Sequence, residues 1–121
     1  ILADNLIQFG YCDTFEEYAD WLWKADILPV TSNQDFFGIS IIEASYCHTC
    51  PILPKRLSYT ELFDFDNNPD YFYETDEQLY SKLKKYLLSS KDAIFKKIDL
   101  IDRYDWKKIV QLYDKTFSDF K

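Results

Sequence analysis

The sequence predicts an α/β fold built on a parallel sheet, and three observations support this. Apolar runs at residues 6–10, 27–30 and 50–53 have the length of buried strands. Stretches of helical length and composition separate these runs, and strand-helix-strand units of this size form parallel sheets with right-handed crossovers. The last third of the chain has helical periodicity. We therefore expect a Rossmann-like parallel sheet with flanking helices and a helical C-terminal extension.

The first unit is a strand at residues 6–10, which ends in a turn, followed by a helix at residues 14–25. Thr14 and Glu17 have the spacing of a capping box, which marks the start of that helix. One helical face is apolar, and we expect it to pack on the sheet. Its members are Phe15, Tyr18, Ala19, Leu22 and Ala25.

The second unit is a strand at residues 27–30 followed by a helix at residues 38–47, and the loop between them is a candidate ligand site. Such a loop lies at the carboxyl end of a strand, where open α/β sheets bind ligands. The N–H groups at the start of the helix attract anions. Gly38 has no Cβ, so a ligand could approach its backbone closely.

Two acids, Asp35 and Glu43, flank Gly38 on this loop and helix, and their spacing allows two interpretations. A nucleotide diphosphate-sugar would place its diphosphate at Gly38, its ribose at Glu43 and its sugar hydroxyls at Asp35. Alternatively, Asp35 caps the helix and Glu43 is an ordinary solvated acid. The spacing alone leaves both interpretations open.

The remainder of the chain predicts one more strand and several helices. A third strand at residues 50–53 precedes a short helix at residues 59–63 and a turn at residues 64–70. A capping box at Thr75 and Gln78 begins a long helix. We expect the apolar stripes of this helix and of two later ones to be core. The stripes comprise Leu79, Leu83, Tyr86 and Leu87, then Ile94, Ile98 and Ile101, then Trp106, Ile109, Val110, Tyr113 and Phe117.

Composition limits the classes of function. A chain of 121 residues with 47% hydrophobic residues can form one domain with a real core. The net charge of −7 argues against broad attraction to nucleic acid. The sequence has neither the apolar stretch of a membrane span nor a signal peptide, so we expect a soluble, cytoplasmic protein. The absence of methionine suggests a fragment of a longer chain.

Cysteine and basic residues give weaker signals. Cys47 and Cys50 have the spacing of half a metal or redox site, but the sequence has no second pair to complete a zinc tetrahedron. We expect no metal, and small packing residues in a reducing compartment instead. Lys55 and Arg56 follow the third strand on the ligand side, where a phosphate contact and a solvated pair are both open interpretations.

The candidate loop and helix resemble a known motif. An acid, seven residues and then Glu, with Phe-Gly inside and Glu-Ala at the end, is similar to the donor-site motif of family-four retaining GT-B glycosyltransferases. The resemblance implies that Glu43 holds the nucleotide ribose and that Asp35 acts catalytically on the transferred sugar. Asp35 stands where the family usually has Glu, which alters its reach. The backbone segment implied to contact sugar and phosphates comprises Phe36, Phe37, Gly38 and Ile39.

Residues 36–38, 43–47 and 51–62 also resemble the glycosyltransferase-like proteins that mannosylate queuosine in tRNA. This implies that residues 1–121 are a partial C-terminal nucleotide-sugar-binding domain, half of a GT-B fold, in a larger two-domain enzyme. The donor would be GDP-mannose, with no cofactor and no metal required. A missing N-terminal domain would bind most of the tRNA acceptor, so the fragment alone is expected to be inactive.

Three other functions remain open at the level of sequence. The chain could be a non-catalytic nucleotide-binding or adaptor domain, which the shortened Asp35 and the acidic charge favour. It could belong to a family-four glycosyltransferase that acts on a lipid or polysaccharide acceptor. It could also be a Rossmann-like interaction domain whose loop binds nothing.

Overall fold

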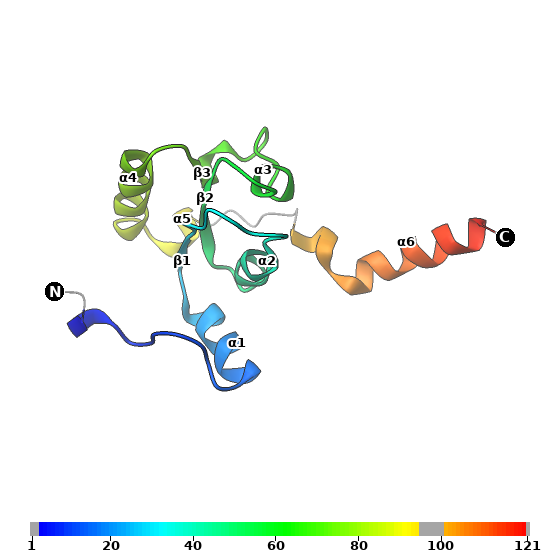
Figure 1. Cartoon of the computed structure of the whole chain (residues 1–121), viewed down its shortest axis with the longest axis horizontal. Helices are drawn as coiled ribbons and strands as arrows, with labels where there is room; N and C mark the ends of the chain where they lie inside the picture. The colour runs from blue at the N-terminus through cyan, green and yellow to red at the C-terminus, as the bar shows by residue number, and fades with distance from the viewer. Residues whose placement is uncertain (1–2, 95–100, 121) are drawn as a thin grey trace.

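The computed structural model describes residues 3–94 and 101–120. Its centre is a three-stranded parallel sheet of β1 (Ile27–Pro29), β2 (Cys50–Pro54) and β3 (Phe72–Tyr73), in the order β1-β2-β3 (Figure 1). Helices flank the sheet, and a further helix extends the chain at its C-terminal end. The predicted α/β, Rossmann-like fold is therefore confirmed.

The middle strand, β2, is buried along its whole length. It pairs with β1 through Ile27 and Cys50 and with β3 through Leu53 and Phe72. Because both faces of a parallel sheet are covered by helices, such a strand is apolar throughout and not alternating. The core is centred on it. The buried cluster consists of Val30, Ile41, Ile42, Cys50, Ile52, Leu53, Tyr59, Leu62, Phe63, Tyr71, Phe72, Tyr73, Tyr86, Ile94 and Ile101.

Helices precede, connect and follow the three strands. Helix α1 (Phe15–Lys24) precedes β1, α2 (Ile39–Tyr46) joins β1 to β2, and α3 (Tyr59–Leu62) lies between β2 and β3. After β3 come α4 (Asp76–Leu87), α5 (Lys91–Ile94) and α6 (Trp106–Asp119). The 3-10 turns are η1 (Ala3–Asn5), η2 (Pro69–Tyr71) and η3 (Ile101–Tyr104).

Both predicted capping boxes begin helices. The Thr14 hydroxyl oxygen accepts a hydrogen bond from the Glu17 N–H at 3.1 Å at the start of α1. The Thr75 hydroxyl accepts one from the Gln78 N–H at 3.3 Å, and the Gln78 side chain in turn accepts one from the Glu74 N–H. These side chains satisfy N–H groups that have no partner within the first turn of a helix.

The predicted strand at residues 6–10 is wrong. This segment has no regular structure in the described chain, and Ile7 is 82% exposed. A strand exists only where a neighbour accepts its backbone hydrogen bonds, and among the described residues β1 pairs with β2 alone. Conversely, the sequence did not predict β3, whose two residues are too few to give a period.

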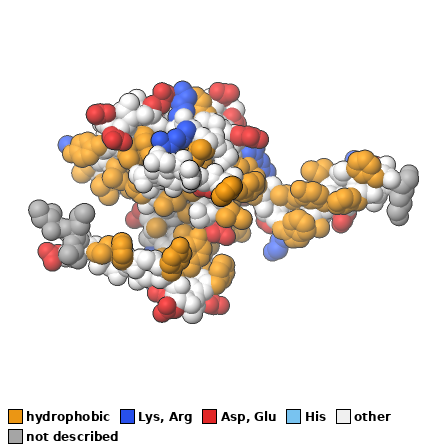
Figure 2. Space-filling model, viewed as in Figure 1, with side chains coloured by type: hydrophobic (Ala, Val, Ile, Leu, Met, Phe, Trp, Pro, Cys, Tyr) orange, Lys and Arg blue, Asp and Glu red, His pale blue; other side chains and the backbone are white. Residues whose placement is uncertain are grey.

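The prediction of buried helical stripes holds for α4 but not for α6. Tyr86 is buried, and Leu79 and Leu83 pack against the core, whereas Leu87 is 69% exposed. No side chain of α6 is buried, although the predicted stripe does lie on one helix. Figure 2 shows its apolar side chains open to solvent along the extended helix.

The helix predicted through Ile94, Ile98 and Ile101 is described only in part. Helix α5 covers Lys91–Ile94, Ile98 lies outside the described residues, and Ile101 belongs to the 3-10 turn η3. None of the described helices has the length and apolar character needed to cross a membrane.

The cysteine thiols are free, and Cys47 and Cys50 are buried, as expected for packing residues. Burial raises the pKa of the Cys50 thiol to about 12, which keeps it protonated and unreactive. His48, between them, has a left-handed φ of 66° and ends α2 where glycine is the usual residue. Its ring packs against Trp23, with the ring centroids 6.0 Å apart.

Candidate functional site

The loop after β1 leads directly into α2, as the sequence predicted, and Gly38 is the N-cap of that helix. Gly38 has a left-handed φ of 76°. A Cβ on Gly38 would lie 3.2 Å from Leu62 Cδ1 and 3.3 Å from Tyr59 Cε1. Glycine is therefore required for two reasons, its backbone conformation and the close packing of α3. The space beside it is filled by protein, not left open to a ligand.

Asp35 holds this loop together through both carboxylate oxygens. Its Oδ1 accepts hydrogen bonds from the N–H groups of Phe37 at 3.1 Å and Gly38 at 2.8 Å. Its Oδ2 accepts one from the Tyr59 hydroxyl at 2.8 Å. The Tyr59 bond, helped by the two N–H groups and opposed by desolvation, lowers the pKa of the Asp35 carboxyl. Asp35 is thus ionised at neutral pH and fastens the loop to α3.

This geometry differs from the helix cap of the alternative interpretation, because Asp35 bonds the N–H groups of Phe37 and of the N-cap residue Gly38, and α2 has no side-chain cap. Asp35 can also accept a further hydrogen bond. A carboxylate oxygen can accept two hydrogen bonds, and among the described residues Oδ2 accepts only that of Tyr59. One acceptor position therefore remains on Oδ2. The N–H groups of Phe37 and Gly38 were predicted to contact the sugar and phosphates, but both already donate hydrogen bonds to Asp35.

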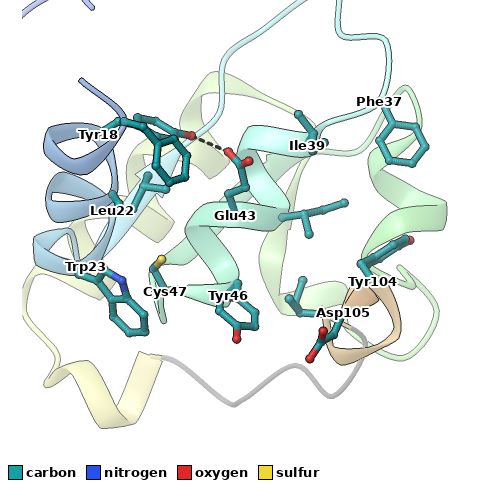
Figure 3. Close-up of a pocket in the computed structure, with 14 residues that line it drawn as sticks. Tyr18, Leu22, Trp23, Phe37, Ile39, Glu43, Tyr46, Cys47, Tyr104 and Asp105 are labelled. Atoms are coloured by element: carbon teal, nitrogen blue, oxygen red, sulfur yellow. Dashed lines mark hydrogen bonds between the residues drawn. The ribbon is translucent and has the colours of Figure 1, made fainter. Parts of the chain in front are cut away.

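Glu43 lies in a different setting, on the wall of a pocket of about 530 Å³ between α1, α2 and η3 (Figure 3). Its Oε2 accepts a hydrogen bond from the Tyr18 hydroxyl at 2.9 Å. Glu43 is half-buried, so it is not the fully solvated acid of the alternative interpretation. Its carboxylate faces a space large enough for a small ligand.

Apolar and aromatic side chains make up most of the pocket. Helix α1 forms one wall and α2 the other, and Tyr104 and Asp105 lie at the edge near η3. Asp105 is available to a ligand only in part, because its Oδ1 already accepts a hydrogen bond from the N–H of Lys107 at the start of α6. The lining residues are Phe15, Tyr18, Ala19, Leu22, Trp23, Phe37, Ile39, Ile42, Glu43, Tyr46, Cys47, Ile101, Tyr104 and Asp105.

The structure separates the six predicted site residues into three pocket residues, two loop residues and one exposed residue. Phe37 and Ile39 line the pocket together with Glu43. Asp35 and Gly38 form the hydrogen-bonded loop beside it, and they do not line the pocket. The sixth predicted residue, Phe36, is fully exposed at the tip of the loop, with a relative exposure of 105%.

The two basic residues after β2 have partners within the protein. Lys55 forms an ion pair with Glu74 at 2.9 Å, and its ammonium group lies 4.4 Å from the ring centre of Phe65. Arg56 donates to the carbonyl oxygen of Ser32 at 2.9 Å. Arg56 therefore holds the backbone at Ser32, in the same loop that Tyr59 bonds at Asp35.

Two tyrosines of this region were not assigned a site role from the sequence. Tyr59 is fully buried against Gly38 and bonds Asp35, and Tyr18 bonds Glu43. A signal existed for Tyr18, because it stands on an otherwise apolar helical face. A tyrosine hydroxyl in such a place needs a hydrogen-bond partner, but the sequence does not identify which residue supplies it.

Comparison with known proteins relates the chain to a curated protein. No protein-family model matches the chain, and neither does any solved structure. The chain is 30% identical over 123 aligned positions to a curated protein of Drosophila melanogaster, and the alignment covers 97% of this chain. It spans only 31% of the length of that relative. The protein to which this chain is similar is named tRNA-queuosine alpha-mannosyltransferase.

Proposed function

We propose that this chain is the C-terminal, nucleotide-sugar-binding part of a retaining GT-B glycosyltransferase that transfers mannose from GDP-mannose to queuosine in tRNA. The observation that carries the proposal is an alignment that covers 97% of the chain, at 30% identity, with a tRNA-queuosine alpha-mannosyltransferase. Since the chain spans about a third of that relative, the proposal includes a second, acceptor-binding domain. We place the enzyme in the cytoplasm, where tRNA is available.

The pocket supports the role proposed for Glu43, which is to accept the ribose hydroxyls of the nucleotide. Carboxylate oxygens are strong acceptors for hydroxyl groups. The aromatic and aliphatic walls, including Phe37 and Ile39, suit the flat apolar faces of a nucleoside. A pocket of about 530 Å³ is of the size that small-molecule sites have.

Asp35 is the proposed acid at the transferred sugar, through the acceptor position left on Oδ2. The exposed segment from Phe36 to the first turn of α2 would meet the diphosphate. Because Asp35 occupies the N–H groups of Phe37 and Gly38, the N–H groups of Ile39 and Ser40 are the ones proposed to face the phosphates. The positive end of the helix dipole stabilises charge on the leaving diphosphate, so we expect transfer without a metal ion.

The acceptor is proposed to bind mainly outside these residues. A net charge of −7 does not favour the phosphate backbone of tRNA. An N-terminal domain with a basic surface would supply that contact. Residues 1–121 alone are therefore expected to show no transferase activity.

The substrates are tested by incubating the full-length protein with a panel of nucleotide sugars and bulk tRNA, followed by mass spectrometry of the tRNA nucleosides. We expect a hexose on queuosine only when GDP-mannose is supplied. Transfer to a lipid or polysaccharide with tRNA unchanged would reject tRNA as the acceptor, while the proposed glycosyltransferase activity would stand.

The donor site is tested by Glu43→Ala in the full-length protein. Loss of a charge-assisted hydrogen bond costs roughly 1.5–3 kcal/mol, so GDP affinity measured by calorimetry should fall at least about tenfold. Glu16→Ala is the matched control, since Glu16 is an exposed acid on α1 outside the pocket. Unchanged affinity in Glu43→Ala would remove Glu43 from the site.

A non-catalytic nucleotide-binding domain is the second candidate, and the hydrogen bonds of Asp35 favour it. Its two oxygens already accept three bonds from the protein. A non-catalytic domain requires that the unmodified full-length protein transfers no sugar, and in a protein that does transfer sugar Asp35→Asn tests the role of Asp35. A catalytic Asp35 requires turnover to fall while GDP still binds, whereas a purely structural Asp35 requires both to fall together.

A further inference from the structure

The hydroxyl of Tyr18 reaches across the pocket wall to the carboxylate of Glu43. The donor comes from α1 and the acceptor from α2, two helices separated by a strand in the chain. The oxygens are 2.9 Å apart in a partly buried setting, and Figure 3 shows the bond crossing between the two helices. Both residues line the pocket, so this bond belongs to the surface that a ligand would meet.

The hydroxyl is fixed as a donor in this bond. Burial, and the hydrogen bond and charge of Glu43, raise the pKa of Tyr18 to about 12. The hydroxyl therefore keeps its proton at neutral pH and donates to Oε2. Among the described residues, Glu43 Oε1 accepts no hydrogen bond, and Oε2 accepts only that from Tyr18. Each oxygen retains acceptor capacity.

The far end of α1 is anchored in a way that keeps Tyr18 at this distance. The buried Thr49 hydroxyl lies 2.9 Å from the carbonyl oxygen of Leu22 and 3.1 Å from that of Ala25. These contacts fasten the last turn of α1 to the start of β2. No side chain of α1 is itself buried, so polar contacts such as these position the helix.

We propose that Tyr18 is a positioning residue that holds Glu43 Oε2 and thereby leaves Oε1 to accept a ribose hydroxyl of the nucleotide. The inference rests on the proposed donor site. A free glutamate side chain must give up rotamer freedom when it binds, and a side chain already held by Tyr18 gives up less. Such preorganisation increases affinity without a direct contact to the ligand.

The test compares GDP with 2′,3′-dideoxy-GDP, which lacks the ribose hydroxyls, by calorimetry on the full-length protein. Tyr18→Phe removes the hydroxyl and retains the ring on the pocket wall. Glu43→Gln marks the complete loss of the charged acceptor. Tyr80→Phe is the matched control, because Tyr80 is an exposed tyrosine on α4 that does not line the pocket.

We expect the unmodified protein to prefer GDP and Glu43→Gln to abolish that preference. Tyr18→Phe should weaken GDP binding by about 3–10-fold through lost preorganisation and leave dideoxy-GDP unaffected, and Tyr80→Phe should change neither. An equal loss for both nucleotides, or no loss, in Tyr18→Phe overturns the role of Tyr18 while the donor site stands. No preference for GDP in the unmodified protein overturns the ribose role of Glu43 and with it the role of Tyr18.

Discussion

Helices α2 and α6 both carry apolar residues at helical spacing, yet only α2 buries them. Ile41, Ile42 and Ala44 of α2 are buried against the sheet, whereas no side chain of α6 is buried and Phe117 is 68% exposed. The helices differ in their neighbours. Helix α2 lies on β2, while α6 packs beside η3 and extends away from the sheet (Figure 1).

The comparison separates two properties that one sequence pattern suggests together. Apolar periodicity establishes which residues share a helical face, and the residues of the predicted α6 stripe do lie on one helix. Burial depends in addition on a surface that accepts that face. The free energy of folding should therefore be concentrated in the sheet and the helices on it, and the following variants test this division.

The largest effect is expected from Phe63→Ala. Phe63 is completely buried in the core, and removing a core phenylalanine ring costs about 3–5 kcal/mol of unfolding free energy. Phe117→Ala in α6 is the paired variant, with an expected change within about 0.5 kcal/mol, as for other surface sites. Urea denaturation measures both. A comparable loss in Phe117→Ala would mean that α6 is packed in solution.

The two glycines of the chain provide the next test. Both have positive φ, but a Cβ on Gly38 would press on Tyr59 and Leu62, and a Cβ on Gly10 would meet nothing within 4 Å. Gly38→Ala should cost about 2–4 kcal/mol, from left-handed strain and overpacking. Gly10→Ala should cost about 1–2 kcal/mol at most. Equal losses would contradict the observed packing of α3 against Gly38.

The smallest effect concerns Asp35. Its pKa is lowered in the folded protein, so its ionised form stabilises the fold above the unfolded value of about 3.9. That contribution is lost as the pH falls through the folded pKa. Asp35→Asn should cost about 1.5–3 kcal/mol at neutral pH and make thermal stability less sensitive to acid. Asp66→Asn, at an exposed turn, is the control and should retain the dependence of the unmodified protein.

Local signals explain what the sequence predicted correctly. The capping boxes at Thr14 and Thr75, the loop before α2 and the alternation of strand and helix each depend on residues close together in the chain. The strand predicted at residues 6–10 depended on a partner that local sequence does not provide, and its apolar side chains are exposed. Strand formation is a property of a pair of segments.

The candidate site shows the same limit. The sequence placed Asp35 on the loop and Glu43 on the helix, and it identified the loop as the place where α2 begins. It did not predict which groups these acids bond, because Tyr18 and Tyr59 lie 25 and 24 residues from their partners. Which side chains meet at such separations is decided by the packing of α1 and α3 around α2.

The order β1-β2-β3 within the sheet is also the order of the strands along the chain, and this has a consequence for the kinetics of folding. Each pairing joins β2 to its neighbour in sequence across a helix-containing connection of roughly 20 residues. The entropy cost of closing such a connection grows slowly with its length. Neither pairing requires contact between segments that are far apart in the chain. We therefore expect a transition state organised around β2, in which substitutions at Ile52 slow folding and substitutions in α6 leave the folding rate unchanged.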